Sequence, residues 1–151
     1  MNGYQRDEEK GRTRYYNDFS RYYTITFTKA PYEYWDFTMT SRTESKREYL
    51  GDVKDVDRPY SKYSTTEDKG FLIDYNKLRE VKKAALNTNR IPVITAYFTD
   101  KRITWNLSKA NWESRAEWRL VNKDGQHYGK KEWEMVTYLY ENEAEDVYEY
   151  N

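Results

Sequence analysis

The sequence predicts a mixed α/β (α+β) fold, with helices flanking a central mixed β-sheet and an extra C-terminal β-hairpin. Residues 23–28 alternate between polar and apolar β-forming residues, and two further short strands are expected within residues 34–56. Residues 71–87 then show helical periodicity. They lead into the nearly continuous apolar run 91–98, which is typical of a central strand covered on both faces.

The elements around these strands follow from local patterns. Tyr15, Phe19 and Tyr22 recur at helical spacing, so we expect a helix over about residues 8–22, although Gly11 weakens it. Residues 58–70 are polar and predict a loop, which serves either as a substrate-contacting flap or as a plain connection. Alternation returns at 103–107, which predicts an outer strand.

The C-terminal third predicts additions to this core. Residues 117–121 and 132–139 resemble strands joined by a turn at 123–125, and they either extend the sheet or form an accessory hairpin. The acidic tail, 141–151, is either frayed or a last short element. We therefore expect one domain over 1–151, with a core at about 8–107 and accessory strands at about 112–140.

Composition narrows the function. The 151 residues include 26 basic and 26 acidic side chains, so any nucleic-acid surface must be local. The absence of cysteine excludes disulfides, thiolate metal sites and a cysteine nucleophile. No apolar run is long enough for a bilayer and no signal-peptide core follows Met1, which predicts a soluble, cytoplasmic protein without membrane association. A phage or mobile-element origin fits equally well.

The strands within 34–56 carry the main chemical clue. Alternate side chains of the first strand are expected to face a core, and these are Trp35, Phe37 and Met39. Asp36 then faces away. On the next strand Asp52 and Lys54 share a face with Leu50 and Val56. If a turn at 42–46 pairs the strands as antiparallel neighbours, Asp36 lies near Asp52 and Lys54.

An acid-x-Lys tripeptide has little value alone, because five occur here, beginning at Glu8, Glu44, Asp52, Glu67 and Glu80. Asp52 alone lies in an apolar-flanked strand that follows a strand with another acid. Two such carboxylates attract a hard divalent cation, for which Mg²⁺ or Mn²⁺ is the expected cofactor. Lys54 would orient the attacking water or stabilise charge on a phosphate.

At these residues the chain resembles the PD-(D/E)xK nuclease superfamily, the restriction-endonuclease-like fold. Asp36 matches the first acid, Asp52 the second and Lys54 the lysine, while Trp35 replaces the motif's proline and Asp52 its commoner Glu. The resemblance covers about residues 8–107. It implies a metal-dependent deoxyribonuclease in which Asp36, Asp52 and the Val53 carbonyl bind the metal.

Further residues are candidates for supporting roles. The resemblance suggests Lys77, on the helix after the motif, as an auxiliary residue, and Glu8 or Glu9 as a further metal-shell acid. Lys82 and Lys83 lie on the charged helix face and either follow a phosphate backbone or are simply solvated. DNA is the expected partner, and a homodimer is possible because many nucleases of this fold dimerise.

Two other interpretations remain open. Asp36, Asp52 and Lys54 can form an ordinary cross-strand ion pair on a half-solvated sheet. The chain can also be a non-catalytic module that retains the nuclease-like fold, with either a structural role or a binding role. Its 17 tyrosines and 5 tryptophans would suit recognition of a protein or of single-stranded nucleic acid by stacking.

Overall fold

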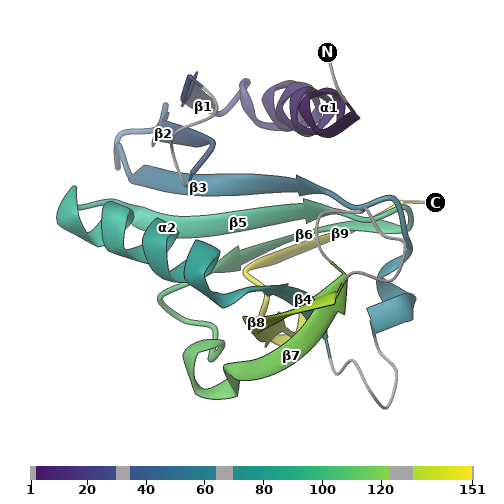
Figure 1. Cartoon of the computed structure of the whole chain (residues 1–151). Coiled ribbons are helices and arrows are strands. Elements are labelled where there is room, and N and C mark those ends of the chain that lie inside the picture. The colour runs from purple at the N-terminus through teal and green to yellow at the C-terminus, as the bar shows by residue number, and fades with distance from the viewer. Residues whose placement is uncertain (1–2, 30–34, 64–69, 123–130, 151) are drawn as a thin grey trace.

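The computed structural model describes residues 3–29, 35–63, 70–122 and 131–150, which fold into two α-helices and two β-sheets. Helix α1 (Gly3–Phe19) lies on one face of the larger sheet (Figure 1). Helix α2 (Tyr75–Asn87) and the smaller sheet lie on the other face. The predicted mixed class, a mixed sheet with flanking helices, is confirmed. Among the described helices none combines the length and apolar character needed to cross a membrane.

The larger sheet has six strands in the order β1-β2-β3-β5-β6-β9. Their bounds are β1 (Tyr23–Phe27), β2 (Phe37–Ser41), β3 (Glu48–Asp55), β5 (Ile91–Tyr97), β6 (Lys101–Asn106) and β9 (Asp146–Glu149). Strands β3 and β5 are parallel and all other neighbours are antiparallel. The chain passes from β3 to β5 through β4 and α2, the kind of crossover connection that a parallel pair requires.

The smaller sheet contains the predicted C-terminal hairpin. Its antiparallel order is β4-β8-β7, where β4 is Phe71–Asp74, β7 is Glu117–Asn122 and β8 is Lys131–Leu139. The turn predicted at 123–125 lies outside the described residues. Short 3₁₀ helices occupy Tyr60–Tyr63, Glu113–Arg115 and Glu141–Glu143.

Two hydrophobic cores hold the layers together. Tyr15 of α1 packs with Phe37, Val53 and Tyr97 on one face of the larger sheet. The other core lies between that sheet, α2 and the smaller sheet, and its fully buried members include Trp105, Trp112, Leu78, Ile94 and Leu139. The six-stranded sheet is thus buried on both faces near its centre, as a parallel β3–β5 pair requires.

The prediction of a helix over 71–87 is wrong for residues 71–74, which form strand β4. Phe71 and Ile73 are buried and pair with β8, so the alternation of this segment is that of a strand. Asp74 then caps α2, because its Oδ1 accepts a hydrogen bond from the Asn76 amide at 2.9 Å.

Smaller differences concern the ends of elements. Helix α1 begins and ends earlier than predicted, and strand β6 is internal because the tail supplies β9 as the edge strand. Trp35 packs against the α2-side core, whereas Phe37 and Met39 face the α1 side. Asp36 lies just before β2 and is buried.

Gly51 on β3 is fixed by close packing with its neighbours. A Cβ atom there would collide with the Val93 carbonyl oxygen and lie 2.7 Å from Val93 Cγ2 and 2.8 Å from Phe37 Cζ. At Gly11, in the middle of α1, the nearest atom to such a Cβ is Val53 Cγ1 at 3.3 Å.

We therefore predict that Gly51→Ala lowers the free energy of unfolding by about 2–4 kcal/mol, because β3 must move away from β5 and Phe37. Gly11→Ala is the matched control and is expected to change stability by less than about 1 kcal/mol, since the helix propensity gained offsets the tight contact. Urea denaturation of both variants measures the difference. Equal stabilities would contradict this account of Gly51.

Candidate active site

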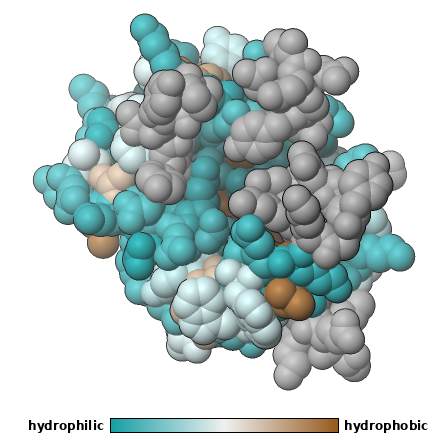
Figure 2. All heavy atoms as spheres, in the orientation of Figure 1, coloured by the Kyte–Doolittle hydropathy of each residue, from teal (hydrophilic) through white to brown (hydrophobic). Residues whose placement is uncertain are grey.

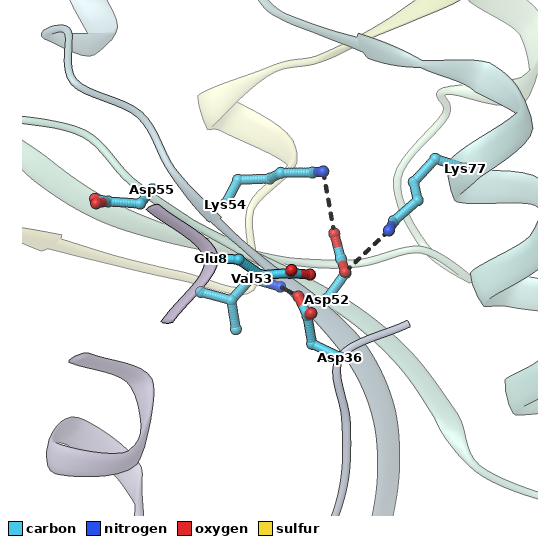
Figure 3. Close-up of a pocket in the computed structure, with 7 residues that line it drawn as sticks. All are labelled: Glu8, Asp36, Asp52, Val53, Lys54, Asp55 and Lys77. Carbon is cyan, nitrogen blue, oxygen red and sulfur yellow. Dashed lines mark hydrogen bonds and ion pairs between the residues drawn. The ribbon is translucent and has the colours of Figure 1, made fainter. Parts of the chain in front are cut away.

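A pocket of about 210 Å³ lies where α1, β3 and the start of α2 meet (Figure 3). It is lined by Glu8, Asp36, Asp52, Val53, Lys54, Asp55 and Lys77. The structure thus brings together the predicted Asp36, Asp52 and Lys54 with Val53 and two of the auxiliary candidates. Glu9 is exposed on α1 and does not line the pocket.

The pairing of β2 with β3 places the two aspartates side by side. Phe37 pairs with Gly51 in this antiparallel register. Asp36 precedes Phe37 and Asp52 follows Gly51, so the two aspartates lie opposite each other. The Asp36 amide donates to the Gly51 carbonyl at 2.8 Å, and the Val53 amide donates to Asp36 Oδ2 at 2.8 Å. Asp36 and Asp52 are only 3% and 1% exposed. Local backbone bonds therefore hold two carboxylates together away from water.

Two lysines approach Asp52 from different elements. Lys54 Nζ lies 3.5 Å from Asp52 Oδ2, and Lys77 Nζ of α2 lies 3.2 Å from Oδ1 (Figure 3). In the described part of the chain no hydrogen-bond donor reaches Oδ2, although this oxygen is buried. Asp52 is therefore paired by charge but still has a buried oxygen without a hydrogen bond.

The pKa of Asp52 is raised from its ordinary value of 3.8 to about 7. Burial away from water is the main cause, and the charge and hydrogen bonding of Asp36 raise it further. The charges of Lys54 and Lys77 act in the opposite direction without cancelling these effects. The Asp52 carboxyl therefore keeps its proton to a higher pH than an exposed aspartic acid does.

Helix α1 supplies a cation to Asp36 that the sequence patterns did not single out. Arg12 Nη2 lies 3.0 Å from Asp36 Oδ1, and Arg12 Nη1 donates to the Thr28 carbonyl at 2.7 Å. The Thr28 hydroxyl in turn donates to the Trp35 carbonyl at 2.9 Å. Helical spacing could have indicated Arg12, because it follows the candidate Glu8 by four residues and therefore lies on the same face of the helix.

The remaining charged candidates have other surroundings. Asp55 lines the pocket, but its carboxylate pairs with Lys10 at 3.3 Å and with Arg14 at 3.1 Å, both from α1. Lys82 pairs with Glu113 at 2.6 Å, and Lys83 is exposed on α2. Neither of these two lysines lines the pocket.

Within the described ranges, no three acidic or histidine side chains are grouped closely enough to hold a metal ion by themselves. Any metal here would rest on the Asp36–Asp52 pair, with backbone carbonyl and water oxygens completing its shell.

No protein-family model, curated protein or solved structure matches the chain.

The raised pKa predicts a pH-dependent effect of Asp52→Asn. A raised carboxyl pKa means that the folded state binds the proton more tightly than the unfolded chain, so stability falls as pH rises from about 3.8 to about 7. Asparagine removes this penalty. Without metal, Asp52→Asn should therefore be at least about 1 kcal/mol more stabilising, relative to wild type, at pH 8 than at pH 4. Chemical denaturation at the two pH values measures this, with the exposed Asp57→Asn as control.

Arg12 should be coupled energetically to Asp36. Arg12→Gln leaves a buried carboxylate without its cation and is expected to cost about 2–4 kcal/mol. A double-mutant cycle with Asp36→Asn should give a coupling free energy of about 1–3 kcal/mol. Arg14→Gln is the matched control on the same helix, and it should cost less because Asp55 keeps Lys10. A coupling near zero would show that Arg12 does not support Asp36.

Proposed function

We propose that the chain is a metal-dependent nuclease of the PD-(D/E)xK, restriction-endonuclease-like class that hydrolyses phosphodiester bonds in DNA. The observation that carries the proposal is the meeting of Asp36, Asp52 and Lys54 in one pocket. An isolated surface ion pair, the plainer alternative, fits less well, because both aspartates are buried and lie next to each other.

The order of elements supports the same class. Helix α1 precedes the three antiparallel strands β1, β2 and β3, and α2 then leads to β5, which is parallel to β3. The first acid lies just before β2 and the acid-x-Lys tripeptide lies on β3. This is the arrangement that the resemblance implies for the core, in which β6 is the last strand, with β9 and the smaller sheet as additions.

The residues present fit a hard divalent cation. Asp36 and Asp52 supply adjacent carboxylates, Asp52 Oδ2 is a buried oxygen without a hydrogen-bond donor, and the Val53 carbonyl is the third expected ligand. Glu8 lines the same pocket from α1 and is placed to hold an outer water. Bound Mg²⁺ or Mn²⁺ would supply an activated water and polarise the phosphate.

The chain's own residues have separate tasks in this proposal. Arg12 and the Val53 amide orient the Asp36 carboxylate. Lys54 and Lys77 place two positive charges beside Asp52, where they would stabilise negative charge developing on a phosphate. Lys77 supplies its charge from α2 and Lys54 supplies its charge from β3. Both lysines now pair with Asp52. A bound metal would compete with the lysines for this carboxylate, and a substrate phosphate would compete with Asp52 for the lysines.

Cleavage and metal binding in matched variants test the proposal. Single-stranded, duplex and branched DNA and RNA are incubated with Mn²⁺ and the wild-type chain. Asp52→Asn and Lys54→Met should each lower the cleavage rate by at least about 100-fold. Calorimetric titration should show Mn²⁺ binding lost in Asp36→Asn and Asp52→Asn but kept in Lys54→Met, because lysine is not a ligand.

Asp57→Asn is the control, since Asp57 is exposed just beyond β3 and does not line the pocket. It should retain both cleavage and Mn²⁺ binding. A folded wild-type chain that neither binds Mn²⁺ nor cleaves any of these substrates would refute the nuclease. The predicted homodimer stays a prediction and is checked by the sedimentation of the same samples.

A second candidate, a non-catalytic binding module, is favoured by the surface of the β7–β8 hairpin. Trp118 and Trp133 are 64% and 66% exposed, and Leu120, which pairs with Trp133, is 43% exposed. Side chains of intermediate hydropathy gather over β7 beside the mostly hydrophilic α2 (Figure 2). Such a surface suits stacking on bases or docking of a protein. Binding of single-stranded DNA or protein without cleavage in Mn²⁺ would favour this function.

A further inference from the structure

A second cavity, of about 340 Å³, lies on the face of the larger sheet opposite Asp52 and Lys54. It forms between the C-terminal half of α1 and the strand ends farthest from the candidate active site. Its lining residues are Tyr15, Phe19, Tyr23, Met39, Arg47, Tyr49, Ile91, Val93, Thr104, Asn106, Lys109, Glu145 and Asp146. Its volume is in the range of small-molecule sites.

The walls of this cavity are largely aromatic. Tyr15 and Phe19 come from α1, with ring centroids 4.5 Å apart. Tyr23 and Tyr49 meet edge to face at 5.7 Å. Ile91 of β5 adds an aliphatic surface. These walls suit a planar ring, which would be held by stacking and edge contacts.

Two polar groups in the lining have no partner among the residues that the structure describes. Asn106 is only 9% exposed, and its Oδ1 accepts a hydrogen bond from the Ser108 amide at 2.9 Å. This bond leaves the Nδ2 donor free, and no described residue bonds to it. The Arg47 guanidinium likewise has no ion pair or hydrogen bond to a described residue. The Asn106 Nδ2 atom is open to the cavity and the Arg47 side chain is exposed, so both can donate to an acceptor that enters from solvent.

The other charges of the lining are already compensated. Lys109 pairs with Glu145 at 3.3 Å, and Asp146 pairs with Arg102 at 3.6 Å. The Thr104 hydroxyl shares a 2.7 Å hydrogen bond with Thr95. What the cavity lacks is an acceptor bearing negative charge, within reach of Arg47 and Asn106.

We propose that this cavity binds a small planar aromatic anion, with its ring against the aromatic walls and its anionic group on Arg47 and Asn106. The shared chemistry is one or two rings with a single carboxylate or phosphate. The site is separate from the proposed nuclease pocket, and its occupancy does not depend on that activity.

Titration of the full ¹⁵N-labelled chain with 4-hydroxybenzoate and with thymidine 5′-monophosphate, followed by NMR, tests the proposal. Each anion has a neutral analogue as its control, namely 4-hydroxybenzamide and thymidine. At least one anion should bind with a Kd below about 1 mM and shift the Asn106 side-chain amide resonances. The anion that binds more tightly identifies an aromatic acid or a nucleotide as the source of the ligand.

Arg47→Gln should weaken binding of that anion at least about tenfold, which corresponds to about 1.4 kcal/mol. Arg42→Gln is the matched control, because Arg42 is exposed in the same β2–β3 connection and does not line the cavity. It should bind as wild type does. Equal binding of the neutral analogues, an unchanged affinity in Arg47→Gln, or unshifted Asn106 amide resonances would each overturn the proposal.

Discussion

The antiparallel pairing of β2 with β3 is the constraint on which the rest of the site depends. Its register puts Asp36 opposite Asp52. Hydrogen bonds from the Asp36 amide to the Gly51 carbonyl and from the Val53 amide to Asp36 Oδ2 fix the Asp36 carboxylate beside Asp52. Two buried negative charges at such a short separation are unfavourable without compensation. The surrounding elements must therefore supply positive charge here. The absence of a side chain on Gly51 lets β3 pack closely against Val93 and Phe37.

That compensation is divided between the two faces of the sheet. Arg12 reaches Asp36 from α1, while Lys77 reaches Asp52 from α2. The division is uneven, because Asp36 has a guanidinium and a backbone amide, whereas one oxygen of Asp52 lacks a hydrogen-bond donor. The raised pKa of Asp52 expresses the same imbalance. Under the proposed function a divalent cation would correct it.

Patterns within short segments predicted most of the fold. Alternation located β1, β7 and β8, and the continuous apolar run located β5. The predicted proximity of Asp36 to Asp52 and Lys54 required only that two strands adjacent in the sequence pair as an antiparallel hairpin. Prediction failed where a distant strand decided the outcome. The segment 71–74 fits a helical stripe, but pairing with β8 makes it a strand. The acidic tail likewise becomes β9 only because β6 offers a free edge.

The sequence by itself determined the layered mixed fold and the strand pair at which Asp36 and the acid-x-Lys tripeptide meet, because these depend on periodicity and on contacts between neighbours in the chain. Only the tertiary structure decided which cations meet these acids and where the sheet is left uncovered. Arg12 and Lys77 reach the acids because two helices pack on opposite faces of β3. The cavity around Asn106 exists because α1 covers only part of its face. Helix packing of this kind depends on shape and charge summed over distant segments, which no local pattern records.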